Sequence, residues 1–154
     1  MITYDDVFET MGRIYFIRAL QEKVVIVGRN NNERAKSALI KGHEMAYKLY
    51  RRKTKLIEIA TKKPCEAAYK FKDLSVRFLF LDYPKDLVFF NSMLKCWGEK
   101  ICLNGVMILR GNYEDGELED HPIDERYEGS LHGIYRIEPP LTMLYKKWGM
   151  PYVE

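Results

Sequence analysis

Apolar residues recur at two different spacings along this chain, and the two spacings alternate. The run Val24-Val25-Ile26-Val27-Gly28 is short, rich in β-branched residues and closed by glycine, which is typical of a buried strand. Residues 33–52 instead place apolar side chains at the three- and four-residue spacing of a helix. Thr3 followed by Asp6 has the form of a capping box and predicts an N-terminal helix over residues 3–21.

The same alternation continues through the middle of the chain. It predicts two further helices and three further strands: helices over residues 64–69 and 86–100, and strands over residues 55–60, 75–81 and 105–109. Strands that alternate with helices are typical of a mostly parallel sheet with helices on both faces. We therefore expect a Rossmann-like three-layer α/β sandwich and, at 154 residues, a single domain over residues 1–154, with residues 1–22 as an N-terminal helix.

The last third of the chain has a weaker pattern. Residues 111–129 are rich in glycine and acidic residues, which predicts a loop or lid beside the sheet. Pro139-Pro140 interrupts any helix across residues 131–148, and Pro140 predicts the start of a new helix that ends near Gly149. The pattern leaves residues 133–138 open between strand and helix.

Composition places the chain among globular proteins. It is 47% apolar and 31% charged, and no apolar run approaches the ~20 residues that span a bilayer. The start, Met-Ile-Thr-Tyr-Asp-Asp, lacks the basic and then apolar order of a signal peptide. We expect a cytoplasmic protein with no membrane partner.

The charge is unevenly distributed. The net charge is +3, but residues 114–128 hold eight acidic residues against one arginine, so the rest of the chain carries 24 minus 14, or +10. Residues 29–72 alone contain thirteen Lys or Arg against four Glu. Such a stretch either attracts a nucleic acid or forms the solvated faces of two helices, and we favour the solvated faces.

Three cysteines lie in apolar surroundings: Cys65, Cys96 and Cys102. None belongs to a Cys-x-x-Cys pair. This predicts buried, reduced thiols in preference to a disulfide framework or a metal site.

Polar side chains follow two of the predicted strands. Asp82 and Lys85 come after the strand over residues 75–81, and Asn112 comes after the strand over residues 105–109. In an open parallel sheet the ligand crevice lies at the carboxyl ends of the strands, so these residues are expected to converge there. Each also has a structural alternative: Asp82 as a helix cap, Lys85 as a solvated charge, and Asn112 as a turn residue.

The middle of the chain resembles a known family. FKDLSVRFLFLD (residues 71–82), a helix with Trp97, and NGVMI (residues 104–108) resemble, in this order, the second half of class I S-adenosylmethionine-dependent methyltransferases. Glu66-Ala67-Ala68 is similar to the Glu-Ala-Ala helix of that family. The resemblance covers most of the chain from Val24 onward. It implies S-adenosylmethionine as the cofactor and methyl transfer to an oxygen or nitrogen nucleophile of an unidentified small or macromolecular acceptor.

A closer likeness concerns the candidate crevice. LDYPKD (residues 81–86) and the later GVMILRGN (residues 105–112) are similar to the catechol O-methyltransferase type. That likeness implies that Lys85 takes the proton from the acceptor, with Asp82 beside it, and that Asp82 and Asn112 hold Mg²⁺. Gly111 stands where the type has a second metal-binding Asp, so a Mg²⁺ site would be one carboxylate short.

The resemblance also implies where the cofactor binds. The implied contacts are Val27, Gly28, Arg29, Asn30, Glu58, Asp82 and Tyr83. Glu58 would bond the ribose hydroxyls if residues 55–60 are the second strand, whereas the alignment of Glu66-Ala67-Ala68 would make that strand the third and leave no such acid. Of the Gly-rich turn of the family, only Gly28 is present.

A second function follows from these departures. A methyltransferase-like domain that no longer binds the cofactor would serve as a binding module, with the basic residues 29–72 recruiting a nucleic acid or a protein. The sequence leaves both functions open.

Overall fold

The computed structural model describes residues 2–18, 22–50, 56–111, 113, 125–127, 137–138 and 140–146. The helices are α1 (Tyr4–Arg18), α2 (Glu33–Tyr50), α3 (Pro64–Ala68) and α4 (Leu87–Gly98). The strands are β1 (Ile2–Thr3), β2 (Lys23–Gly28), β3 (Leu56–Ala60), β4 (Val76–Asp82), β5 (Ile101–Arg110), β6 (Glu125–Tyr127), β7 (Ile137–Glu138) and β8 (Leu141–Tyr145). None of the described helices combines the length and apolarity needed to cross a membrane.

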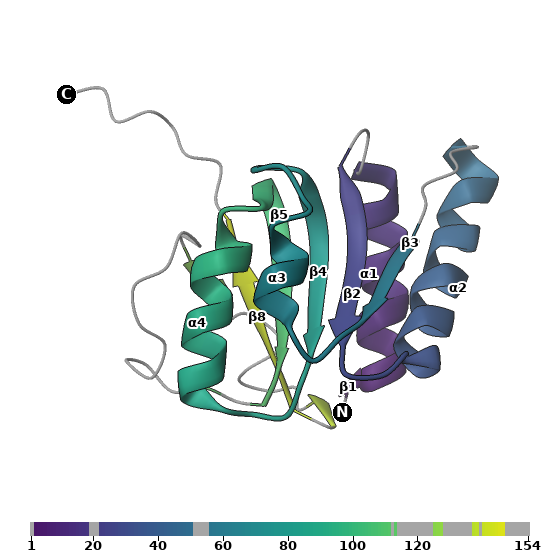
Figure 1. The fold of residues 1–154 in the computed structure, drawn as a ribbon. Coiled ribbons are helices and arrows are strands. Elements are labelled where there is room, and N and C mark those ends of the chain that lie inside the picture. Colours follow the sequence, from purple (N-terminus) through teal and green to yellow (C-terminus); the bar gives the residue numbers. More distant parts are fainter. Residues whose placement is uncertain are drawn as a thin grey trace.

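The main sheet has six strands in the order β3-β2-β4-β5-β8-β6. Its first four strands are mutually parallel, β8 runs antiparallel to β5, and β6 runs antiparallel to β8. The chain passes from β2 to β3 on one side and then crosses to β4 on the other side of β2 (Figure 1). The order therefore reverses between β2 and β4, which is the switch point where doubly wound sheets bind ligands.

Helices cover both faces of the sheet, as the alternation predicts. Because successive side chains of a strand point to opposite faces, β2 and β4 each supply two cores. Val24, Ile26, Phe78 and Phe80 pack against α1 and α2, whereas Val25, Val27, Leu79 and Leu81 pack in the core that α3 and α4 cover. The Rossmann-like three-layer architecture is confirmed (Figure 1).

Two glycines let α1 and α2 meet backbone to backbone. A Cβ at Gly12 would overlap the carbonyl of Leu39, and a Cβ at Gly42 would overlap the carbonyl of Glu9. Any larger side chain at these two positions would push the helices apart. The pair of helices is consequently a rigid support for the turn that links β2 to α2.

Polar residues cap the N-termini of two helices. Thr3 and Asp6 exchange backbone and side-chain hydrogen bonds, so the capping box predicted for the first helix is confirmed. Asp86 caps α4 by accepting a hydrogen bond from the Phe89 amide at 3.0 Å. The alternative interpretation of Asp82 as the cap of this helix is wrong, which leaves Asp82 to other partners.

The prediction of a helix that starts at Pro140 is wrong, because residues 141–145 form strand β8. Leu141 and Met143 pack on one face of the sheet and Leu144 packs on the other. A strand buried on both faces has no polar alternation, so its short apolar run looks the same as a buried helical segment. Pairing with both β5 and β6 decides the conformation.

The predicted loop or lid over residues 111–129 is corrected in part. Residues 125–127 form strand β6, while residues 112, 114–124 and 128–129 lie outside the described residues. Of the segment left open, residues 137–138 form β7, which pairs with β1. Residues 19–21 of the predicted N-terminal helix also lie outside the described residues.

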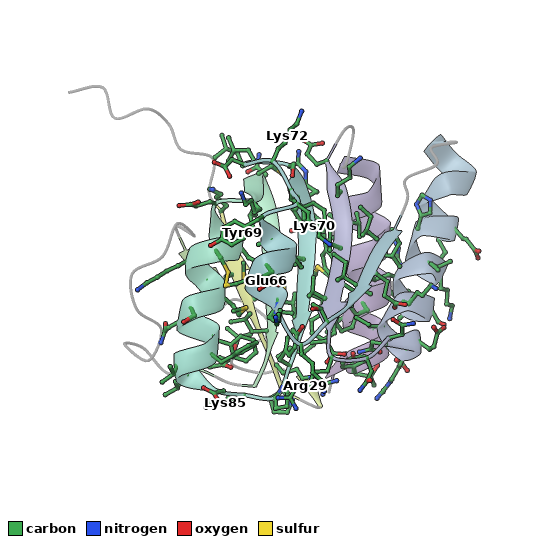
Figure 2. All side chains as sticks on the ribbon, viewed as in Figure 1. Arg29, Glu66, Tyr69, Lys70, Lys72 and Lys85 are labelled. Atoms are coloured by element: carbon green, nitrogen blue, oxygen red, sulfur yellow. A yellow bond between two sulfur atoms is a disulfide. The ribbon has the colours of Figure 1, made fainter. Side chains whose placement is uncertain are left out.

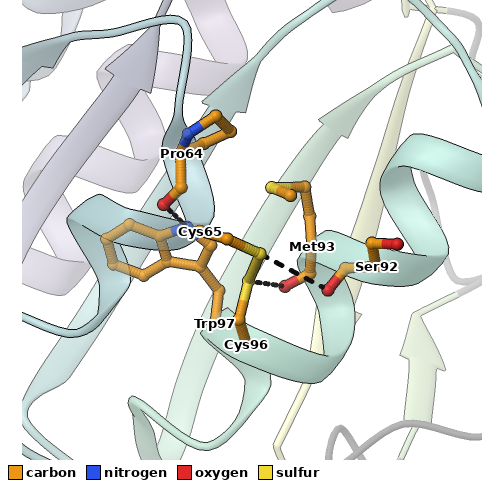
Figure 3. Close-up of a disulfide and its surroundings, with 6 residues drawn as sticks. All are labelled: Pro64, Cys65, Ser92, Met93, Cys96 and Trp97. Carbon is orange, nitrogen blue, oxygen red and sulfur yellow. Dashed lines mark hydrogen bonds between the residues drawn. A yellow bond between two sulfur atoms is a disulfide. The ribbon is translucent and has the colours of Figure 1, made fainter.

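The expectation of three reduced cysteines is wrong for two of them. Cys65 of α3 and Cys96 of α4 form a disulfide, with their Cα atoms 5.9 Å apart (Figure 3). The two helices pack side by side, and the Trp97 indole nitrogen donates to the Pro64 carbonyl at 3.0 Å in the same contact. Cys102 is a buried free thiol whose pKa is raised by burial. The spacing of the cysteines gave no sign of this packing.

Candidate functional site

A cavity of about 490 Å³ lies at the carboxyl ends of β2 and β4, at the switch point of the sheet. Its lining comes from the turn after β2 and from the ends of β4 and β5: Arg29, Asn30, Asn31, Asn32, Glu33, Asp82, Pro84 and Arg110. Its volume falls within the range of small-molecule sites. Arg29 is at the lower edge of the sheet in Figure 2, where the parallel strands end. The cavity is therefore the candidate ligand site.

Asp82 is the centre of a hydrogen-bond network in this cavity. Its side chain is only 12% exposed, and its Oδ1 accepts from Nε of Arg110 in an ion pair. Its Oδ2 accepts from Nδ2 of Asn32 at 2.8 Å. Both carboxylate oxygens thus have donors, and the network joins the turn after β2 to the ends of β4 and β5.

Asn32 connects this network to the two helices. Its Oδ1 accepts from the Ala35 amide at 2.9 Å, which makes Asn32 the N-cap of α2. Its Nδ2 also donates to the Tyr4 hydroxyl at 2.9 Å. Burial raises the pKa of Tyr4, so this hydroxyl stays neutral at physiological pH. The result is a fixed wall for the cavity.

The packing of the sheet explains why residue 28 is a glycine, without any contact to a ligand. It pairs with Asp82 in the sheet, and a Cβ at Gly28 would lie 3.0 Å from the Asp82 carbonyl oxygen and 3.1 Å from the Asp82 Cβ. A side chain there would separate the ends of β2 and β4. Val27 packs in the core beneath α3 and α4, so its side chain is not part of the cavity lining.

Tyr83 lies behind the cavity rather than in its lining. It is buried, its hydroxyl donates to the Thr61 carbonyl at 2.7 Å, and its ring centroid is 5.0 Å from that of Phe89. Burial raises the pKa of Tyr83 to about 12. A ring held in this way is a packing residue beneath the site and not a stacking surface for a ligand.

Glu58 does not reach the carboxyl edge of the sheet. It pairs with Ile26 in the middle of β3, two positions before the strand ends at Ala60. Its Oε2 is buried and has no hydrogen-bond partner among the described residues. The residues that follow the strand, Thr61 and Lys62, are not acidic. The structure therefore does not bring an acid from β3 to the cavity.

Lys85 lies at the same edge as Arg29 (Figure 2) but does not line the cavity. Its Nζ is 5.0 Å from the centroid of the Tyr113 ring, a cation–π contact. Its methylene groups pack over Gly111, where φ is +94° and a Cβ would lie 3.0 Å from the Lys85 Cδ. Asn112, the third residue predicted for the crevice, lies outside the described residues.

The described residues do not fit a Mg²⁺ site. Asp82 is the one predicted metal ligand among them, and both of its oxygens already accept hydrogen bonds from Arg110 and Asn32. Across the described part of the chain, no group of three or more His, Cys, Asp and Glu residues is placed to hold a metal ion. The function proposed below therefore does not use Mg²⁺.

Sequence reasoning missed most of the network around Asp82. Arg110, Glu33 and Tyr4 were not predicted as site residues, although each is part of the cavity lining or hydrogen-bonded to it. Arg110 carries a signal of the same kind as Asp82, because both are charged residues at the end of a buried strand. Tyr4 gave no such signal, since it reaches the site from the first turn of α1.

Comparison with solved structures identifies the fold. The chain is similar to a Corynebacterium glutamicum protein solved by a structural genomics consortium, with a TM-score of 0.52 and 9% sequence identity over 96% of this chain and 82% of that protein. A probable spermidine synthase from the same organism matches at a TM-score of 0.38 and 10% identity, over 70% of this chain and 48% of that protein. No protein-family model and no curated protein matches the chain. The likeness to the first of these proteins establishes the α/β fold, and the chemistry of the site must indicate the function.

Proposed function

We propose that the protein is an S-adenosylmethionine-dependent methyltransferase that binds its cofactor in the switch-point cavity. The observation that carries the proposal is the position of the cavity at the reversal of strand order between β2 and β4, with charged side chains from three strand ends around it. The resemblance of residues 71–82 and 104–108 to class I methyltransferases supports it.

The lining fits the amino-acid end of S-adenosylmethionine. Arg29 and Arg110 supply positive charge for a carboxylate, and the N-terminus of α2 adds a partial positive charge at the same place. Glu33 supplies negative charge for an ammonium group. Asp82 acts on the ligand through Arg110, because its carboxylate fixes the direction of that guanidinium.

The lining offers a different set of groups to the adenosine end. Asn30 and Asn31 are exposed in the turn after β2, and their amides suit the ribose hydroxyls in place of the acid that β3 does not provide. Pro84 gives an apolar contact for a base. This replacement is the main way in which the proposed site departs from its family.

The cofactor supplies an electrophilic methyl group, so the protein contributes mainly position. Holding a nucleophile in line with the methyl group converts a bimolecular step into an intramolecular one. Lys85 is at the edge of the sheet that carries the cavity. In the proposal Lys85 first gives its own proton to solvent, and its neutral amine then accepts the proton of the hydroxyl or amine acceptor.

Titration calorimetry with S-adenosylmethionine and S-adenosylhomocysteine tests the proposal. Binding at millimolar or lower concentration is expected for the folded chain. Arg29→Gln is expected to weaken binding about tenfold, because the variant loses a charge-assisted hydrogen bond to the ligand. Arg29 is exposed, so the substitution should leave the fold intact. Arg13→Gln, an exposed arginine on α1 away from the cavity, is the matched control and should bind as the parent does. No heat with either ligand, for a chain with an intact thermal transition, would refute the proposal.

A second candidate function is a cofactor-free binding module, and one observation favours it. The carboxylate of Asp82 is neutralised by Arg110 and also accepts a hydrogen bond from Asn32, as in a structural ion pair. This candidate predicts no calorimetric signal with either ligand and a partner bound elsewhere on the surface.

A further inference from the structure

Another cavity lies at the opposite edge of the sheet. Its volume is about 580 Å³, and it is lined by residues at the start of β2 and before β4: Glu22, Lys23, Lys70, Phe71, Lys72, Asp73, Leu74 and Ser75. The two cavities therefore lie at opposite ends of the same two strands. In Figure 2 Lys72 marks this upper edge, Tyr69 and Lys70 lie lower down beside α3, and Arg29 lies at the other end.

Both acids in this lining are already paired with cations, one in β4 and one in the turn before β5. Glu22 pairs with Arg77 at 2.6 Å, and the two side chains are 21% and 13% exposed. Asp73 pairs with Lys100 at 2.8 Å, and the Lys100 side chain is 12% exposed. These pairs cancel the negative charge of the lining, so the net charge of the cavity comes from its lysines.

Three lysines carry that charge. Lys23, Lys70 and Lys72 are all exposed, and none forms an ion pair with any residue that the structure describes. The backbone around them is fixed, because the Lys23 amide donates to the Ser75 carbonyl at 2.8 Å and the Ser75 hydroxyl donates to the Lys72 carbonyl at 2.6 Å. The backbone that carries the lysines is thus held in place at this cavity.

Exposed apolar side chains accompany the lysines. The ring of Tyr69, beside Lys70 at the end of α3, is 75% exposed, and Leu74 in the lining is 51% exposed. Stacking on aromatic side chains together with a basic groove is the way in which proteins bind unpaired bases and their backbone. A double helix keeps its bases stacked inside and offers none to Tyr69.

We propose that this amino-edge cavity binds single-stranded nucleic acid, with Lys23, Lys70 and Lys72 on the phosphates and Tyr69 on a base. The proposal is independent of the cofactor cavity at the carboxyl edge. It also limits the part of residues 29–72 that binds nucleic acid to Lys70 and Lys72 with Tyr69. The whole stretch cannot act together, because α2 and α3 cover opposite faces of the sheet and do not form one surface. In α2, Arg34 and Lys41 are already paired with Asp5 and Glu9.

Fluorescence anisotropy with a labelled twelve-nucleotide oligothymidine, titrated with the full chain at several salt concentrations, tests the proposal. Three phosphate contacts on a single strand give an expected slope of about −2 in log K against log salt. Lys70→Glu with Lys72→Glu should weaken binding more than tenfold and lower the slope. Tyr69→Ala should weaken binding about tenfold without a change of slope.

The matched control is Lys62→Glu with Lys95→Glu, which makes the same charge change at two exposed lysines outside the cavity. An equal loss of affinity in this control would show attraction by net charge alone and would overturn the proposal. So would the absence of binding at 20 mM salt, or equal affinity for a duplex of the same length. Thermal melts of all variants establish that each chain is folded. S-adenosylhomocysteine is expected to leave the affinity unchanged.

Discussion

The two ends of the β2–β4 strand pair carry cavities of similar size, but the charged side chains of the two linings are paired in different ways. At the carboxyl edge the charges face one another, since Asp82 and Arg110 pair within the lining. At the amino edge the acids pair with Arg77 of β4 and with Lys100 before β5, both outside the lining, and the lysines of the lining have no described ion-pair partner. The carboxyl edge is therefore balanced and polar, whereas the amino edge is basic.

This difference separates two kinds of recognition. A balanced lining with fixed donors and acceptors suits a small zwitterion, because each group of the ligand meets its opposite. A lining with one sign of charge attracts an extended polyanion and depends strongly on salt. The two proposals therefore place a cofactor site at one end of the same sheet and a surface for a larger partner at the other end.

The largest expected effect concerns the disulfide that holds α3, the helix leading into the amino edge. Replacing Cys65 and Cys96 by alanine should lower the free energy of unfolding by about 3 to 4 kcal/mol, because a cross-link 31 residues apart in sequence restricts the unfolded chain. Denaturant titration with and without a reductant measures it. The reductant should destabilise the parent chain and not the double variant. If the reductant leaves the free energy of unfolding of the parent chain unchanged, this cross-link does not stabilise the fold.

The next effect sharpens the carboxyl side of the comparison. Asp82→Ala leaves the Arg110 guanidinium without its ion pair and removes one acceptor of Asn32, so it should cost about 2 to 3 kcal/mol of unfolding free energy. Asp5→Ala is the control, since Asp5 and Arg34 form an exposed pair that should contribute less than about 0.5 kcal/mol. Equal losses in the two variants would contradict the network.

A smaller effect appears only at high pH, through Tyr83 behind the cavity. The pKa of Tyr83 is raised from 10.0 to about 12, so the unfolded chain releases this proton first as the pH rises. Tyr83 therefore stabilises the fold fully below pH 10, and about 2 kcal/mol of that stability is lost between pH 10 and pH 12. In Tyr83→Phe this loss should be absent. Unfolding measured from pH 8 to pH 11.5 in both chains, with the same slope in each, would refute the assignment.

Much of the fold could be predicted because local pattern and tertiary position agree. The capping box of Thr3 and Asp6, the buried run of β2 and the helical spacing of α2 each point to the structure that forms. Strand β8 could not be predicted in the same way, since it is buried on both faces and takes its conformation from β5 and β6.

The site was less predictable than the fold, because it depends on contacts between distant residues. Asp82 was placed correctly at a strand end beside Gly28 and Arg29. Its partners Arg110 and Asn32 come from 28 and 50 residues away in sequence, and no local pattern encodes such pairs. Tyr83 and Glu58 have suitable chemistry, but neither lines the cavity. Tyr83 follows β4 and packs in the core beneath α3 and α4, whereas Glu58 lies in the middle of β3.

A crystal structure of the chain soaked with S-adenosylhomocysteine tests the central claim most directly. The account predicts electron density for the ligand in the switch-point cavity, with its carboxylate at Arg29 or Arg110 and its ribose at Asn30 or Asn31. An empty cavity at saturating ligand, with Asp82 and Arg110 still paired, would contradict the proposed methyltransferase and leave the binding module as the function of this fold.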